Sequence, residues 1–210
     1  MALVLNGSGI TSANIADGTI VNADVADVAA SKLTGALPAI DGSALTGMPA
    51  GGKVLQVVSV SKADTYSSSG TTFADITGLA ASITPSATTS KIMVIIDLGY
   101  SMASVNNTTF NLRALRDSTV IAAGNTSGSR DLGFFEHNTA QAFYDIYLNL
   151  LRTGVTDLDS PSSTSSLTYK VQGRISNPSN TFYINRSAND TDSSRYVRSS
   201  STITLMEIGA

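Results

Sequence analysis

From residue 53 onward, short segments rich in Val, Ile, Leu, Tyr and Phe alternate with segments of Ser, Thr, Gly and Asn. β-Branched and aromatic residues between such turn-forming residues are typical of strands. The expected strands cover 53–61, 72–76, 80–84, 91–102, 108–115, 118–123, 141–151, 166–175, 180–186 and 201–208. Short strands at this spacing predict an all-β sandwich or barrel.

The acidic residues support this fold class. The chain has 16 Asp and Glu residues, and only Glu136 and Glu207 are Glu. Asp is favoured at turns and caps, whereas Glu is favoured inside helices. Charged residues make up only 14% of the chain, so Ser and Thr supply much of its polarity, as is common on extracellular β proteins.

Residues 1–52 differ from the rest of the chain. They contain no aromatic residue and no Arg, and Lys32 is their only basic residue, so this segment cannot form a core of its own. The segment ends in Met48-Pro49-Ala-Gly-Gly52, whose Pro and paired Gly residues are typical of a boundary. We therefore expect an N-terminal segment over 1–52 and a β-sandwich head domain over 53–210.

The N-terminal segment carries short apolar repeats. Each repeat begins and ends with an apolar residue five positions apart: Ile10–Ile15, Ile20–Val25 and Val28–Leu33. Repeats that cannot bury their apolar residues alone do so against neighbours, here other copies of the chain. This favours an extended, intertwined shaft that attaches to a larger particle, and the alternative is a disordered tether.

Three expected strands are apolar on both faces, whereas 166–175 alternates cleanly between apolar and polar residues. In 142–151, four apolar residues from Tyr144 to Leu150 oppose Phe143, Tyr147 and Leu151. In 91–100, five apolar residues from Ile92 to Tyr100 oppose Met93 and Ile95. In 53–60, the residues Val54, Val58 and Val60 oppose Leu55 and Val57. Because a two-layer sandwich buries one face of each sheet, we expect the second apolar face to be covered by a subunit interface or by a loop.

Composition excludes several function classes. The net charge is −3 and the 13 basic residues form no run, so nucleic-acid binding is not expected. The chain has no Cys and therefore no disulfide, thiolate zinc site or catalytic thiol. No stretch is long and apolar enough to insert into a membrane, and the N-terminus does not resemble a signal peptide. An extracellular protein without an export signal fits synthesis in the bacterial cytoplasm and release by lysis within a virion.

No catalytic or metal site is expected. His137 is the only His, and no Gly-x-Ser-x-Gly segment exists, which argues against a serine hydrolase and an imidazole metal site. His137 is expected on the surface, between strands. A glycosidase needs two carboxylates, but the nearest pairs fall in Ser/Thr-rich segments, where Asp normally forms turns. Residues 189–194 lack the Gly and the terminal Glu of an EF-hand calcium loop, so we expect an Asx-turn there rather than a calcium-binding site.

The most plausible binding residues lie in two polar segments, 152–165 and 187–200. If consecutive strands alternate in direction, the loops 62–71, 85–90, 152–165 and 187–200 all lie at the end away from residue 53. Loops on a rigid scaffold are the usual place for recognition. The receptor-binding candidates are Asp157, Asp159, Asp190, Asp192, Arg195, Tyr196 and Arg198.

Several segments resemble tail-fibre-like proteins of tailed phages that infect marine and freshwater bacteria, cyanophages included. These segments are 37–47, 53–62, 83–86, 90–92, 115–118, 183–187 and 201–208, and they cover strands and turns over most of the chain. The resemblance implies a virion structural protein, usually a homotrimer, with a jelly-roll-like head. The implied role is a short tail fibre or spike. Its N-terminal segment would contact other virion proteins, and its head would contact a host glycan or outer-membrane protein. A capsid-decoration or baseplate-connector protein is the alternative, and a glycan depolymerase is a further one.

Overall fold

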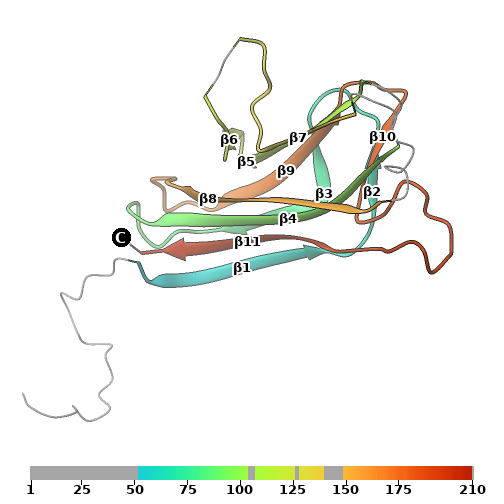
Figure 1. The fold of residues 1–210 in the computed structure, drawn as a ribbon. Helices are drawn as coiled ribbons and strands as arrows, with labels where there is room; N and C mark the ends of the chain where they lie inside the picture. Colours follow the sequence, from blue (N-terminus) through green and yellow to red (C-terminus); the bar gives the residue numbers. More distant parts are fainter. Residues whose placement is uncertain (1–51, 104–106, 126–127, 140–148, 210) are drawn as a thin grey trace, which may run out of the picture. The chain divides into compact units, whose positions relative to one another are not determined.

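The computed structural model describes residues 52–103, 107–125, 128–139 and 149–209, and within these ranges it contains strands and no helix (Figure 1). The strands are β1 (Val54–Lys62), β2 (Tyr66–Ser68), β3 (Ala74–Ile83), β4 (Lys91–Ala103), β5 (Thr109–Arg116), β6 (Thr119–Ile121), β7 (Phe135–Asn138), β8 (Leu151–Asp159), β9 (Leu167–Ile175), β10 (Thr181–Ile184) and β11 (Ser201–Ile208). The expected all-β, jelly-roll-like antiparallel sandwich is confirmed. The expected shaft lies outside the described residues, apart from Gly52.

The strands form two antiparallel sheets. In sheet A, β4 is central: β11 and β10 follow each other along one side of it, β8 pairs with its other side, and β1 and β2 lie outside β11 and β10. In sheet B, β9 pairs with β3 and β5, and β5 pairs on its other side with β7 and β6. We call the end of sheet A that carries Gly52 and Gly209 the base. There, the Gly52 amide donates to the Gly209 carbonyl oxygen over 2.9 Å.

The core lies between the two sheets. It is built from alternate residues of the long strands, as in β9, where Leu167, Tyr169, Val171 and Ile175 are buried, as the sequence predicts. Near β10, the rings of Phe110 and Phe182 stack between the sheets with centroids 4.5 Å apart. Gly173 makes room for this stack, because a Cβ at that position would lie only 3.0 Å from the Phe182 ring.

Several segments differ from the predicted strands. The segment 62–71, expected as a loop, contains β2. The two strands expected over 72–76 and 80–84 are one strand, β3, with a register shift between Asp75 and Ala80. The segment 152–165, expected as a loop, contains most of β8, and His137 lies on β7 rather than between strands. The strand expected over 141–151 falls mostly on residues that the structure does not describe.

These differences change the end of sheet A at which some of the loops lie. Loop 85–90 leads into Lys91, which pairs with Ile208 at the base, and the loop after Asp159 leaves beside Ile92 at the same end. The prediction that both would lie away from residue 53 is therefore wrong. Loop 187–200 does lie away from the base, because it joins β10 to β11 where Ser201 pairs with Lys62 at the end of β1.

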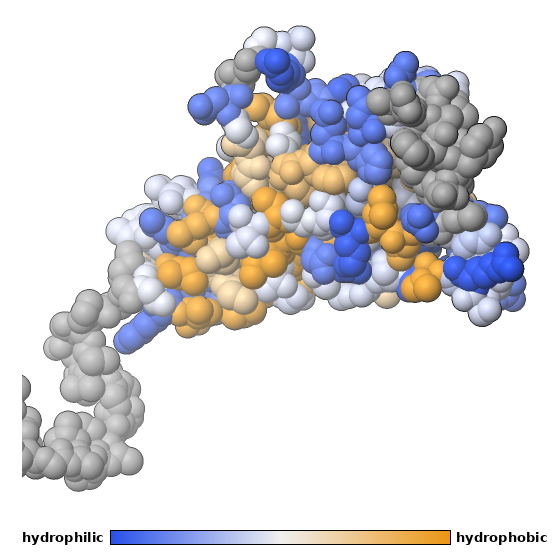
Figure 2. All heavy atoms as spheres, in the orientation of Figure 1, coloured by the Kyte–Doolittle hydropathy of each residue, from blue (hydrophilic) through white to orange (hydrophobic). Residues whose placement is uncertain are grey.

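The outer face of sheet A is apolar near the base. Val57, Met206, Met93 and Leu158 are direct cross-strand neighbours on β1, β11, β4 and β8, and we call them the apolar row. Val57 is 54% exposed and Leu158 is 46% exposed. Figure 2 shows hydrophobic residues gathered over this part of the molecule. Val54 joins them, contrary to expectation, because a bulge between Val54 and Gln56 places it opposite Ile208.

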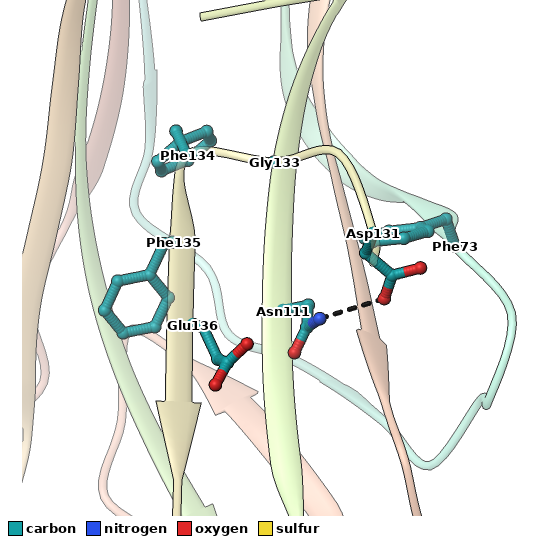
Figure 3. A pocket seen from close by; sticks show the side chains of 7 residues that line it. All are labelled: Phe73, Asn111, Asp131, Gly133, Phe134, Phe135 and Glu136. Carbon is teal, nitrogen blue, oxygen red and sulfur yellow. Dashed lines mark hydrogen bonds between the residues drawn. The ribbon is translucent and has the colours of Figure 1, made fainter. Parts of the chain in front are cut away.

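The outer face of sheet B is polar. Arg174, Asn111 and Glu136 are cross-strand neighbours on β9, β5 and β7, and Figure 3 shows the last two beside each other. Arg113 donates from Nε to Gln172 over 2.8 Å, and Lys170 forms a 2.9 Å ion pair with Asp75. The two sheets thus present outer faces of opposite character.

Candidate functional site

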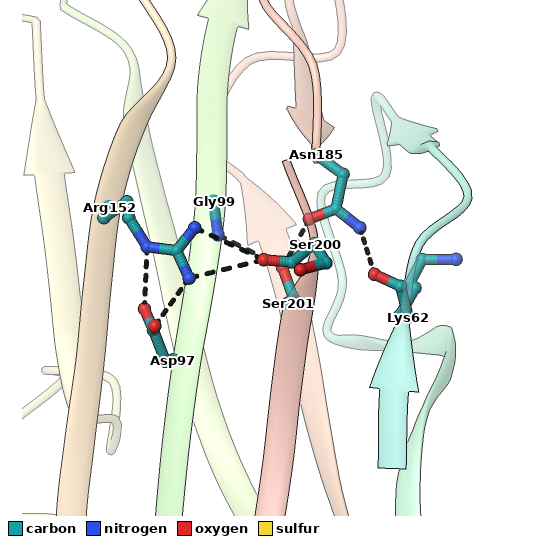
Figure 4. A network of polar contacts seen from close by, with 7 residues as sticks. All are labelled: Lys62, Asp97, Gly99, Arg152, Asn185, Ser200 and Ser201. Carbon is teal, nitrogen blue, oxygen red and sulfur yellow. Dashed lines mark hydrogen bonds and ion pairs between the residues drawn. The ribbon is translucent and has the colours of Figure 1, made fainter. Parts of the chain in front are cut away.

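Loop 187–200 contains five of the predicted binding residues, and its two ends are held by a compact polar network (Figure 4). Asn185 stands immediately before the loop with a φ of 64°, a left-handed conformation that Asn adopts more readily than most residues. Its Nδ2 donates to the carbonyl oxygens of Lys62 at 2.7 Å and Asp64 at 2.9 Å. Its Oδ1 accepts from the Ser201 hydroxyl at 2.6 Å. The side chain therefore ties together the end of β1 and both ends of the loop.

A second connection holds the end of the loop from β8. Arg152 donates to the Ser200 carbonyl oxygen over 3.3 Å and forms an ion pair with Asp97 on β4, with an N–O distance of 2.5 Å. The Gly99 amide donates to the Ser201 hydroxyl over 3.1 Å. Three strands of sheet A therefore fix the point at which the loop returns to the sheet (Figure 4).

Asp190 organises the interior of the loop. Arg198 donates to both of its carboxylate oxygens, from Nη2 at 2.6 Å and from Nε at 3.2 Å. Arg186 lies 3.4 Å from the same carboxylate and also covers the Tyr183 ring, 4.1 Å from its centroid. The hydrogen bond from Arg198 lowers the pKa of Asp190 below its usual value. Asp190 and Arg198 therefore mainly shape the loop.

Four of the predicted residues meet in one hollow. Asp190, Asp192, Tyr196 and Arg198 line a space of about 300 Å³ together with Thr191 and Ser193. Asn189 donates to the Tyr196 hydroxyl over 3.0 Å, and Thr191 donates to Asn189 Oδ1 over 2.6 Å. Within the described ranges, Asp192 has no hydrogen-bond or ion-pair partner, so its carboxylate is the group in this hollow most available to a ligand.

Arg195 lies apart from these four residues. It lines a neighbouring hollow of about 460 Å³ together with Asn149, Leu150, Arg152, Ser187, Val197 and Ser199. Val197 is 64% exposed, the largest value among the exposed large hydrophobic residues of the described chain. The loop thus presents two adjoining surfaces, one acidic and hydroxyl-rich and one with a guanidinium beside an exposed apolar side chain.

Asp157 and Asp159 do not belong to this site. Both lie on β8 near the base, and both face the interior of the sandwich rather than solvent. Arg116 from sheet B donates to the Asp159 carboxylate at 2.6 Å, and the Tyr169 hydroxyl donates to it at 2.7 Å. Asp157 accepts from the Ala122 amide at 3.2 Å. Their prediction as receptor-binding loop residues is therefore replaced by a structural role.

His137 is half-buried and lies against aromatic residues. Its Nδ1 is 2.8 Å from the Tyr100 hydroxyl, and its ring packs edge-on against the Tyr100 ring. Burial lowers the pKa of His137 and raises the pKa of Tyr100 to about 12. Both shifts favour the neutral forms of the two groups, which share this hydrogen bond.

The described part of the chain contains no cluster of three or more His, Asp or Glu residues suited to a metal ion. At 189–194, hydrogen bonds to the side chains of Asn189 and Ser193 organise the turn, including a 3.4 Å bond from the Arg195 amide to Ser193.

Among the described residues, no helix has the length and apolar character needed to cross a membrane.

Sequence reasoning missed one further hollow, on the outer face of sheet B. It has a volume of about 260 Å³ and is lined by Phe73, Asn111, Asp131, Gly133, Phe134, Phe135 and Glu136. These residues come from β5, β7 and two connecting segments. The segment Asp131-Leu-Gly-Phe-Phe-Glu136 is the sequence signal for it, since two aromatic residues and two carboxylates within six positions are unusual in a solvent-exposed loop.

No family model matches the sequence, and no curated protein matches it. Solved structures similar to this chain include a subviral particle of infectious bursal disease virus VP2, which is 12% identical with a TM-score of 0.32. That match covers 73% of this chain and 41% of the VP2 chain. A structure of the Gx strain of the same virus is 15% identical over 74% of this chain and 38% of its own, with a TM-score of 0.29. The chain spans less than half the length of both structures, and a likeness of this size carries no argument about its function.

Proposed function

We propose that this chain is a structural protein of a tailed-phage virion, a short tail fibre or spike that assembles as a homotrimer and contacts the host surface. Its N-terminal segment 1–52 attaches to other virion proteins, and its β-sandwich head joins copies together and carries the recognition loop. The resemblance of its strand and turn segments to tail-fibre-like proteins supports the virion role. The single observation that carries self-assembly is the exposed apolar row on sheet A.

The apolar row has the features of a buried protein interface. Its four members are adjacent across four strands, so they form one continuous strip rather than scattered side chains. Val54 and Leu55 extend the strip at the base and are 54% and 46% exposed. A contiguous apolar surface with a polar surround is typical of an interaction site.

The surround of the row favours a second copy as the partner. The next cross-strand set along the sheet consists of Ser59, Thr204, Ile95 and Thr156, and beyond it lies the Asp97–Arg152 ion pair. This rim is polar but has no excess of either charge, as an interface between identical surfaces requires. Packing three copies through the row about an axis that runs along the strands also gathers their Gly52 residues at one end, which an intertwined N-terminal shaft requires.

Light scattering on the full-length chain tests the assembly. We expect a mass of three times 21.7 kDa. Val57→Lys places a charge at the end of the row and should lower that mass on dilution. Val197→Lys changes a valine in loop 187–200 that is even more exposed, and it should not lower the mass. A monomeric wild-type chain, or identical dilution behaviour of the two variants, would overturn the proposed assembly.

The host-contact part of the proposal rests on loop 187–200, which is polar, firmly anchored and lies away from the base. Asp192 and Arg195 are the residues to change, because neither side chain has a hydrogen-bond or ion-pair partner in the described part of the chain and the loop should keep its shape. We expect saturable binding of the full chain to host cells that falls in an Asp192→Asn/Arg195→Gln variant. Asp75→Asn, which alters a carboxylate that is 53% exposed on sheet B, outside the loop, is the control.

A purely architectural role, as a capsid-decoration or baseplate-connector protein, is the second candidate. It is favoured by the same apolar row, since that surface also suits contact with another virion protein. Absence of host-cell binding, together with particles that lose integrity without the protein, would select this role. The proposal assigns no catalytic step to the chain. In each of the two nearest carboxylate pairs, one member forms an ion pair with an arginine: Asp159 with Arg116, and Asp190 with Arg198.

A further inference from the structure

The hollow on the outer face of sheet B contains a buried hydrogen-bonding atom without a partner. Asn111 is only 8% exposed, and its Nδ2 donates to Asp131 over 2.9 Å, as Figure 3 shows. Its Oδ1 has no partner among the described residues. A buried acceptor left without a donor is costly, so a donor from outside the chain that reaches this atom would be stabilising.

Glu136 offers more acceptors next to that atom. It is the cross-strand neighbour of Asn111, so both side chains lie on the same side of the β5–β7 pair. Its carboxylate has no hydrogen bond or ion pair with any described residue, and Figure 3 shows it turned toward the Asn111 side. This wall of the hollow therefore presents acceptors without donors, and beside it the Nε of Arg174, the cross-strand neighbour of Asn111, is a buried donor that also has no partner among the described residues.

The other walls are apolar and held in place. Phe73 is fixed by two guanidiniums, with Arg113 at 4.2 Å and Arg174 at 5.4 Å from its ring centroid. The Phe134 amide donates to the Leu112 carbonyl oxygen over 3.1 Å. Gly133 lies so close to β5 that a Cβ would collide with that same carbonyl oxygen. The hollow is therefore formed before any ligand binds.

The charges around the hollow select the kind of ligand. Asp131 is paired with Arg174, and Arg113 lies against Phe73, so the carboxylates of Asp131 and Glu136 are balanced by two guanidiniums. A cationic ligand would add a positive charge to a site whose charges are already balanced, and an anionic ligand would meet the carboxylates of Asp131 and Glu136 in its lining. A neutral ligand that brings several O–H donors and an apolar C–H surface satisfies both the acceptors and the phenylalanine rings.

We propose that this hollow binds one neutral sugar residue of a glycan. Two sugar hydroxyls donate to Asn111 Oδ1 and to the Glu136 carboxylate, and a C–H face of the ring packs against Phe134. The volume of about 260 Å³ exceeds the roughly 30 Å³ that a single water occupies, so water at the unpaired amide oxygen leaves most of the space unused. The proposal depends neither on self-assembly nor on loop 187–200.

Saturation-transfer NMR on the full-length protein tests this site. The probes are the methyl glycosides of glucose, galactose, mannose, N-acetylglucosamine and rhamnose. We expect at least one of them to bind saturably and weakly. Glu136→Ala removes an exposed side chain that supports no described contact, and it should weaken that binding about fivefold or more, as for loss of a hydrogen bond to a charged group. Asn111→Ala should abolish it.

The controls separate this site from the other surfaces. Asp192→Ala removes a carboxylate from loop 187–200 and should leave sugar binding unchanged, and Val57→Lys should leave it unchanged whatever its effect on mass. The proposal is overturned if none of the five glycosides binds, if Glu136→Ala binds as tightly as wild type, or if Asp192→Ala removes the binding. Tighter binding of putrescine than of every sugar would also overturn it.

Discussion

Arg116 of sheet B and Asp159 of sheet A form an ion pair across the sandwich, with the guanidinium Nη1 2.6 Å from both carboxylate oxygens. The two side chains are only 19% and 10% exposed. The Tyr169 hydroxyl donates to the same carboxylate, so two residues of sheet B depend on one residue of sheet A. Together with apolar packing, this contact fixes how the two sheets meet near the base.

Asp159→Ala should strongly destabilise the head. It leaves a nearly buried guanidinium and a buried tyrosine hydroxyl without their acceptor, which costs about 3 kcal/mol in a pair of this kind. Denaturant unfolding at fixed protein concentration measures the change. Asp97→Ala breaks the Arg152 ion pair, whose members are about half exposed, and should cost less than about 1 kcal/mol. Equal losses in the two variants would contradict the structural importance of Asp159.

Glu207 should make stability depend on acid. Burial alone raises its pKa, but hydrogen bonds from Ser86 and Gln56 outweigh that effect and lower it to about 2. The ionised form is therefore favoured on folding. Its stabilisation is present above pH 4.5, the ordinary value for Glu, and is lost as pH falls from 4.5 through about 2.

A Glu207→Gln variant tests this acid dependence. The new amide turns an N–H group toward the Gln56 Nε2 donor, which now lies 2.6 Å from a carboxylate oxygen. We expect a loss of about 1 to 2 kcal/mol at neutral pH and a flatter stability profile below pH 4.5. Unfolding curves recorded across the acid range provide the measurement. An unchanged slope of stability with pH would show that other carboxylates cause the acid sensitivity.

His137 should titrate below pH 6.5 in the folded protein. Burial lowers its pKa, so the folded state binds a proton less readily than the unfolded chain. Stability should therefore fall as pH drops from 6.5 through the lowered value. NMR of its ring hydrogens gives the pKa directly, since it is the only His. Tyr100→Phe keeps the His137 ring buried and should keep the pKa of His137 low. A return of that pKa to about 6.5 would identify the Tyr100 hydrogen bond as the cause of the shift.

Asn185→Ala should loosen loop 187–200. The change removes three hydrogen bonds that join the loop to β1 and β11, and it leaves Ala in a left-handed conformation. We expect a loss of about 2 kcal/mol and faster amide hydrogen exchange in the loop and at the start of β11. Asn189→Ala, which alters only exposed contacts within the loop, should leave exchange at the start of β11 unchanged.

The sequence predicts the regular strands well because their residues alternate in burial. β9 is the clearest case, since its buried and half-exposed residues follow one another without a break. The sequence of β8 does not predict a strand, because its polar and apolar residues do not match its buried and exposed positions. Asp157 and Asp159 occupy positions that face the interior, where the amide of Ala122 and the side chains of Arg116 and Tyr169 satisfy them. Such compensation by residues distant in sequence leaves no local signal.

The candidate sites show the same limit. Asp190, Asp192, Tyr196 and Arg198 meet because they are close in sequence, so reasoning from one polar segment finds them. The hollow on sheet B joins Phe73, Asn111 and Glu136 through the pairing of β5 with β7 and the position of the segment before β3. Its decisive atom, Asn111 Oδ1, stands out only once the pairing is known.

The apolar row brings together positions 57, 93, 158 and 206, which lie on four strands spread over almost the whole head. No short fragment of the chain contains the strip, and a partly folded head with β11 unpaired lacks half of it, because β1 is joined to the sheet through β11. Pairing of such distant segments is a slow, late event in folding. In the proposed assembly, a partner that binds the strip therefore binds only fully folded heads. Folding of each copy then has to precede assembly.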